Sequence, residues 1–262
     1  MISLSVVNSF VLRMHGPILG LVALGLCGGA NVAGAACSDP PASGVIWIKC
    51  DKHNIDLHGV TLDHAVLIHS NLSGVNLDGA DLTSSDLSFS DLTGARLNGA
   101  RLSEAKLVGA SLRGASLVGA LLGHARLDRA ELAGVTMERA HLEGATLYDA
   151  KASKLQLSGA VLDGAVLDQA DLRDANLVGA SLRGATLIQS KLEKAQFSHA
   201  NLEKARLDRA VLVGADLTMT NLSRASLAGA DLTGAHLDGA VLDNTIWVDH
   251  HRCKPGAVME CP

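Results

Sequence analysis

The apolar positions of this 262-residue chain recur every five residues from residue 55 to residue 247, with no insertion or deletion. Of the 39 positions spaced by five from 57 to 247, 35 hold Leu, and the others hold Met137, Ala152, Phe197 and Trp247. Two residues before each of these centres, 28 of 39 positions hold Ala, and the rest are mostly small or β-branched. Such strict repetition predicts a solenoid whose neighbouring units share one core.

A period of five does not fit a regular helix, because the apolar stripe would wander around every face. It does not fit one continuous flat strand either, since an odd period sends successive Leu residues to opposite faces. Within each unit, however, the small residue and the Leu are two apart, which is strand spacing. The pattern predicts short extended pieces with two inward side chains, separated by corners where residues such as Gly74 and Gly94 supply a permissive backbone.

One unit breaks the pattern. Its centre holds the small residue Ala152 instead of Leu, and the next small position holds the larger residue Leu155. We expect volume lost at one inward site to be regained at its neighbour, although simple repeat decay with a small void would give the same sequence.

Units such as Ala80-Asp81-Leu82-Thr83-Ser84 and Ala175-Asn176-Leu177-Val178-Gly179 resemble the A-(D/N)-L-x-x motif of the pentapeptide-repeat family. The resemblance covers about three quarters of the chain. It implies an all-β fold, a right-handed quadrilateral β-helix with four pentads in each coil. Residues 55–247 would then form nearly ten coils.

Residues 1–36 have the character of a signal peptide. Arg13 precedes an apolar run at 17–26, and Ala33-Gly34-Ala35 fits the small-x-small rule for cleavage. Export to the periplasm or beyond follows, with membrane attachment only if the signal stays uncleaved. Translation could start at Met1 or at Met14.

Four cysteines remain after loss of the signal, in two local pairs that flank the repeat. Proximity predicts disulfides Cys37–Cys50 and Cys253–Cys261; other pairings, or four reduced thiols, stay open. We expect residues 37–54 and 248–262 to cap the two ends of the coil, because open strand edges promote aggregation. Trp47 would lie over the first coil, and Trp247 would close the last inward column.

The repeat offers no sign of an enzyme. Nothing is inserted between residues 55 and 247 to carry a site, and the acids recur at outward positions. Histidines are plentiful, at 53, 58, 64 and 69 and at His250-His251 near Cys253, and we interpret them as surface residues. The sequence therefore predicts no catalytic residue, no cofactor and no metal.

One outward column, spaced by twenty residues, carries the best candidate for binding. Ile68, Val108, Tyr148 and Ile188 alternate in it with Ser88, Asp128 and Asp168. Alternating apolar and acidic residues are consistent with a stripe that faces a protein partner. Chance scatter of surface apolar residues is the alternative.

These observations favour a non-catalytic structural or protein-binding solenoid of the bacterial envelope. The resemblance supplies a second hypothesis, since some relatives mimic DNA and shield topoisomerases from quinolone drugs. Such mimicry needs a densely acidic rod, but residues 55–249 hold 24 acids against 17 bases. We expect no nucleic acid among the partners.

Overall fold

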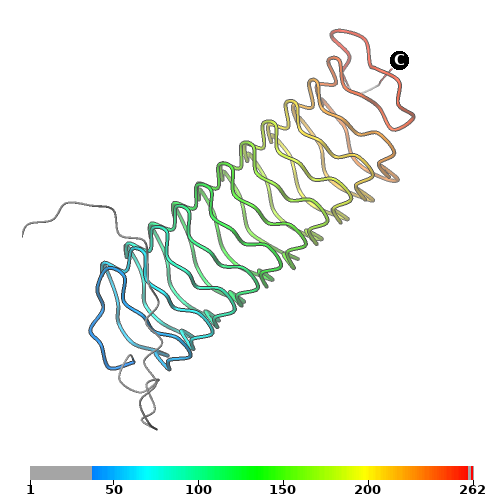
Figure 1. Cartoon of the computed structure of the whole chain (residues 1–262). Coiled ribbons are helices and arrows are strands. Elements are labelled where there is room, and N and C mark those ends of the chain that lie inside the picture. Colours follow the sequence, from blue (N-terminus) through cyan, green and yellow to red (C-terminus); the bar gives the residue numbers. More distant parts are fainter. Residues whose placement is uncertain (1–36, 259–260, 262) are drawn as a thin grey trace, which may run out of the picture. The chain divides into compact units, whose positions relative to one another are not determined.

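The computed structural model describes residues 37–258 and 261, so the expected signal peptide, residues 1–36, lies outside the described residues. The described chain winds into a stack of similar coils (Figure 1). Parallel bridges join residues twenty apart, from Ile46–Val66 to Ser226–Ile246. Four pentads therefore make one coil, and the chain forms the right-handed quadrilateral β-helix that the resemblance implies. At about 4.8 Å per coil, the ten coils over 45–244 are roughly 48 Å long.

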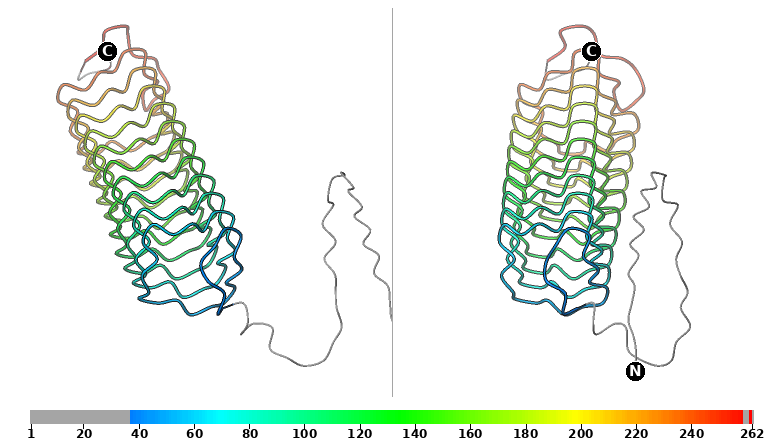
Figure 2. Two further views of the ribbon diagram at one scale, coloured as in Figure 1. Left: turned by 90° about the vertical axis from the view of Figure 1, so that its left-hand side faces the viewer. Right: turned by 60° about the vertical axis from the view of Figure 1, so that its left-hand side comes forward.

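The coil has four sides, each a stack of one-pentad strands bridged in parallel (Figure 2). We number them by their central residues: side 1 runs from Trp47 to Trp247, side 2 from Lys52 to Leu232, side 3 from Leu57 to Leu237, and side 4 from Leu62 to Leu242. Corner 1 is the column of two-residue turns that follows side 1, and the other corners are numbered in the same way.

The interior is built from the predicted inward columns. Every centre from Leu62 to Leu227 is fully buried, and so are Ala152 and Leu155 at the irregular unit. Where Ser or Thr replaces Ala, its hydroxyl is satisfied by a carbonyl; Ser90 Oγ donates to Leu67 O at 2.6 Å. The core is therefore mainly aliphatic, with Trp47 and Phe197 as its buried aromatic residues and each polar exception at these small positions paired.

Each corner is a tight turn whose second residue has a left-handed backbone, in every pentad from Asn54 to Asn244. Gly179 has φ +65°, and Lys204, which carries a side chain, has φ +61°. The turn closes with a backbone bond such as Ala180 N–H to Leu177 O at 3.0 Å. The corner geometry explains the frequent Gly and is kept where Gly is absent.

At the N-terminal end the coil begins at residue 45, inside the segment expected as a cap. Trp47 holds the inward position of side 1 and is fully buried, rather than lying over the coil from outside. Its Nε1–H donates to Asp39 O at 3.2 Å, and the Lys52 ammonium lies 4.1 Å from the ring centre. A disulfide joins Cys37 to Cys50 and holds the preceding segment against this coil.

At the C-terminal end the tail turns back and covers only part of the last coil. Antiparallel bridges Val241–Val258 and Ile246–Arg252 cover sides 4 and 1. Leu232 and Leu237, on sides 2 and 3, stay half-buried, and so does Trp247. The tail is secured by the Cys253–Cys261 disulfide.

Across residues 37–258 and 261, no helix has the length and apolar character needed to cross a membrane.

Candidate functional site

The four residues of the predicted stripe lie in one straight column, at the first turn position of corner 1. Parallel bridges twenty residues apart on side 1 bring them into this column. Ile68, Val108 and Ile188 are half-buried, whereas Tyr148 is 42% exposed and its hydroxyl donates to Gln169 Oε1 at 3.0 Å. The stripe is thus continuous along the corner, and Tyr148 is its most prominent member.

Toward the N-terminal end, corner 1 exposes more apolar surface than the stripe alone. Ile48 is 43% exposed and Phe89 is 54% exposed. The Phe89 ring stacks on His69, with centroids 5.1 Å apart. It also lies over Gly109, where a β-carbon would come within 2.8 Å of the ring. The missing side chain at Gly109 leaves room for the ring to lie flat along the corner.

Two hollows open along side 1 and corner 1. The first, about 510 Å³, is lined by Arg126, Asp128, Arg129, Tyr148 and Asp149. The second, about 390 Å³, is lined by Ile188, Gln189, Arg206, Asp208, Arg209, Ala228 and His250. Each is lined by the two arginines and the aspartate of an identical segment, Ala-Arg-Leu-Asp-Arg-Ala, at 125–130 and at 205–210. Because eighty residues make four coils, the two segments lie about 19 Å apart on the same corner.

The charges of the two hollows are arranged alike. In each, the first arginine pairs with the aspartate: Arg126 Nη2 and Arg206 Nε lie 3.3 Å from Asp128 and Asp208. The second arginine, Arg129 or Arg209, is exposed and forms no ion pair with any residue in the described part of the chain. Each hollow therefore offers one guanidinium outside an ion pair, with the carboxylate of Asp149 also present in the first hollow. Such a guanidinium can bind an anionic group on a ligand.

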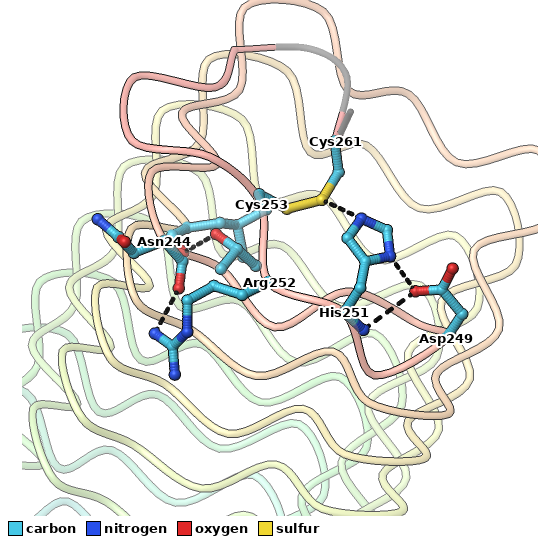
Figure 3. The surroundings of a disulfide bond; sticks show 8 residues. Asn244, Asp249, His251, Arg252, Cys253 and Cys261 are labelled. Atoms are coloured by element: carbon cyan, nitrogen blue, oxygen red, sulfur yellow. Dashed lines mark hydrogen bonds and ion pairs between the residues drawn. A yellow bond between two sulfur atoms is a disulfide. The ribbon is translucent and has the colours of Figure 1, made fainter.

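The histidines named from the sequence are not brought together. His53 pairs with Asp51 at 2.7 Å, His64 pairs with Asp63 at 2.9 Å, and His69 stacks on Phe89. Near the C-terminus, in contrast, His251 lies beside the Cys253–Cys261 disulfide (Figure 3). Hydrogen bonds from the backbone N–H and the ring of His251 hold the pKa of Asp249 below its usual range.

Comparison with known proteins decides the family. The description "Pentapeptide repeats" matches the chain in eight copies between residues 53 and 246. The chain belongs to the pentapeptide-repeat family. No curated protein matches this pentapeptide-repeat chain.

Solved pentapeptide-repeat structures resemble it along most of its length. HetL, a protein of the cyanobacterium Nostoc sp. strain PCC 7120 involved in heterocyst differentiation regulation, is 33% identical over 83% of this chain and 95% of its own, with TM-score 0.42. QnrB1, a plasmid-mediated fluoroquinolone resistance protein, is 18% identical over 70% of this chain and 89% of its own, with TM-score 0.44.

The acidic stretch at the start of this pentapeptide-repeat coil is largely neutralised by the coils that follow. Asp78 pairs with Arg96, Asp81 lies 3.7 Å from Arg101, and Asp86 lies 3.7 Å from Lys106. These partners are about twenty residues apart, so the coil itself brings opposite charges together. A continuous row of phosphate-like charge is not formed on this part of the surface.

Sequence reasoning found the stripe but missed the hollows. The signal was present, because the same six residues recur after eighty positions. The recurrence predicts a shared surface only when the coil is known to have four pentads, because eighty residues then place both copies on one corner. The cluster at His251 lies beyond the repeat. Its signal was His250-His251 near Cys253, which we interpreted as surface histidines.

Proposed function

We propose that this chain is an exported, non-catalytic rod that binds a protein partner along corner 1. The observation that carries the proposal is the pair of matched hollows, which places Arg129 and Arg209 about 19 Å apart on one straight edge. Exposed Tyr148 lies in the first hollow, and Ile188 lines the second. Aromatic and arginine side chains are enriched at protein interfaces, where they contribute most of the binding energy.

The partner chemistry follows from this edge. Apolar contacts at Ile68, Phe89, Val108, Tyr148 and Ile188 would supply buried area, and the two free guanidinium groups would pair with carboxylates of the partner. The partner is thus a protein whose docking face carries acidic groups spaced to match four coils. A rigid coil suits this role, because it presents the two contacts without a cost for ordering the backbone.

The DNA-mimic hypothesis receives no support from the charges. Lys106 and Arg126 follow Asp86 in the same column of side 1, so the acidic row is interrupted within two coils. Opposite charges in one row cancel the negative field by which a DNA mimic would attract a DNA-binding groove. We expect the purified protein to leave gyrase supercoiling unchanged at low and at physiological salt.

Site-specific photo-crosslinking in the native cells tests the binding edge. A crosslinker replaces Tyr148 on corner 1, and the matched control places it at half-buried Ser158 on corner 3. We expect a discrete adduct from position 148 only, and its loss when Arg129→Glu and Arg209→Glu are introduced together. Equal adducts from both positions, no adduct at all, or an adduct that survives the double charge reversal would overturn the proposal.

A further inference from the structure

The C-terminal tail gathers three side chains that can bind a metal ion. The sulfur atoms of Cys253 and Cys261 and a ring nitrogen of His251 all lie within 4.8 Å of one another. Cys253 is 1% exposed, Cys261 is half-buried, and the His251 side chain is 40% exposed. His251 Nε2 lies 3.0 Å from Cys261 Sγ (Figure 3). Within residues 37–258 and 261, this is the one place where three such groups meet.

The orientation of His251 is held from the other side of its ring. Its Nδ1 pairs with Asp249 Oδ1, and its backbone N–H donates to the same oxygen at 3.3 Å. Its carbonyl accepts a bond from Trp247 N–H at 2.7 Å. With Nδ1 held by Asp249, Nε2 is the ring nitrogen that faces the sulfur pair. A carboxylate behind the ring is the usual support of a metal-binding histidine.

We propose that reduction of the Cys253–Cys261 disulfide converts this cluster into a zinc site. Two thiols of a small-molecule or protein reductant give two electrons to the S–S bond and become a disulfide, and each cysteine sulfur gains a proton. Binding of Zn²⁺ then releases both protons and leaves two thiolates and His251 Nε2 as ligands. Thiolate and imidazole are ligands that zinc prefers, and water or a partner's side chain would take the fourth position.

The fold permits the movement that this change requires. Two bonded sulfur atoms lie about 2 Å apart, whereas two thiolates on one tetrahedral zinc, at about 2.3 Å from the metal, lie roughly 3.8 Å apart. Cys253 is anchored, because its N–H donates to Thr245 O at 2.8 Å on the last coil. Cys261 takes part in none of the bridges among the described residues, so it can supply the shift. The site adjoins the C-terminal end of corner 1, where Asp249 occupies the last turn and His250 lines the second hollow, but its ligands His251, Cys253 and Cys261 line neither hollow.

Cobalt titration of the purified mature protein tests the site. The protein is reduced, freed of reductant without oxygen, and titrated with Co²⁺, after which Zn²⁺ is added. We expect one equivalent to give a thiolate-to-cobalt charge-transfer band and tetrahedral d–d bands, which Zn²⁺ removes. Oxidised protein should give neither band.

Five variants make the result specific. His251→Ala should weaken Co²⁺ binding at least tenfold, and Asp249→Asn should weaken it roughly 10–100-fold. His250→Ala, at the neighbouring exposed histidine, and Cys37→Ser/Cys50→Ser, at the other disulfide, should bind as the parent does. Circular dichroism checks that each variant keeps the coil. The proposal is overturned if reduced parent binds no better than Cys253→Ser/Cys261→Ser, or if His251→Ala leaves the affinity unchanged.

Discussion

At the scale of single residues, the corners carry the backbone strain of this fold. A left-handed backbone costs an L-residue roughly 1–2 kcal/mol, and the chain accepts this at corner residues as large as Lys204 and Phe89. What they gain is contact along the corner, as when Phe89 covers Gly109 and stacks on His69. Glycine at a corner removes the strain and also the side chain that could cover its neighbour.

Two alanine substitutions separate backbone strain from packing. Gly179 has φ +65° and no atom within 4 Å of a built β-carbon, so Gly179→Ala should lower the free energy of unfolding by about 1 kcal/mol from strain alone. Gly123 stands at the first turn position without a left-handed backbone, and its β-carbon would meet Glu143 O at 3.9 Å. Gly123→Ala should raise the free energy by about 0.4–1 kcal/mol. Urea unfolding of both measures the difference, and equal changes would show that corner strain is not the cause.

At the scale of one pentad, aspartate before the central Leu stabilises the corner that follows it. Asp81 Oδ1 accepts the backbone N–H of Thr83 at 3.0 Å and the Thr83 hydroxyl at 2.6 Å. Asp231 and Thr233 repeat this arrangement. The threonine hydroxyl contributes most to lowering the pKa of Asp81, Asp216 and Asp231 below 3.8. These bonds connect the strand to its corner within a single unit.

Stability should therefore depend on pH in the acid range. The folded-state pKa of these aspartates is lower than the unfolded value, so their contribution is fully present above about 3.8 and is lost as the pH falls through the folded value. The variant Asp81→Asn/Asp216→Asn/Asp231→Asn keeps the acceptor oxygen but cannot titrate. Its melting temperature should fall less steeply between pH 5 and pH 2 (roughly the span over which such groups titrate) than that of the parent. Parallel curves would exclude these residues as the acid-sensitive groups.

The same scale shows what the sequence could predict. The five-residue spacing of Leu and Ala determines the inward columns, because only one assignment of pentad positions to the interior buries both residue types. The number of sides per coil was predicted from the family resemblance, because the five-residue period alone does not determine how many pentads make one coil. The first two pentads escaped prediction because Trp47 and Cys50 hold inward positions and Lys52 stands at a centre, although Trp47 keeps the five-residue phase. The C-terminal cluster depends on the course of the tail after the turn at Val248–His250, where the periodic pattern has ended.

At the scale of the whole molecule, the two ends differ. A buried Trp47 and the Cys37–Cys50 disulfide hold the start of the first coil, while the tail covers two of the four sides of the last coil. Leu232 N–H and Leu237 N–H find no backbone acceptor among the described residues. Unpaired strand edges can recruit other chains, so the uncovered half of this end is exposed to association.

Export and both disulfides can be checked together. Mass spectrometry of protein from the cell envelope should give a mature start near Ala36 or Cys37, because cleavage is expected after Ala35 or Ala36. Non-reducing peptide mapping of the same material should link Cys37 to Cys50 and Cys253 to Cys261. An intact start at Met1 or Met14, with four free thiols, would contradict both the compartment and the role of the disulfides.

The twenty-residue coil also sets how such a chain can vary in length. Duplication of a DNA segment that encodes one coil between the two hollows would move Arg209 about 4.8 Å farther from Arg129 and leave both on corner 1. Duplication of a single pentad would instead turn everything after it by one side and bring Arg209 to corner 2. Gene duplication or deletion can therefore change the distance between the two arginines in steps of one coil. Any change that is not a whole number of coils places the two arginines on different corners.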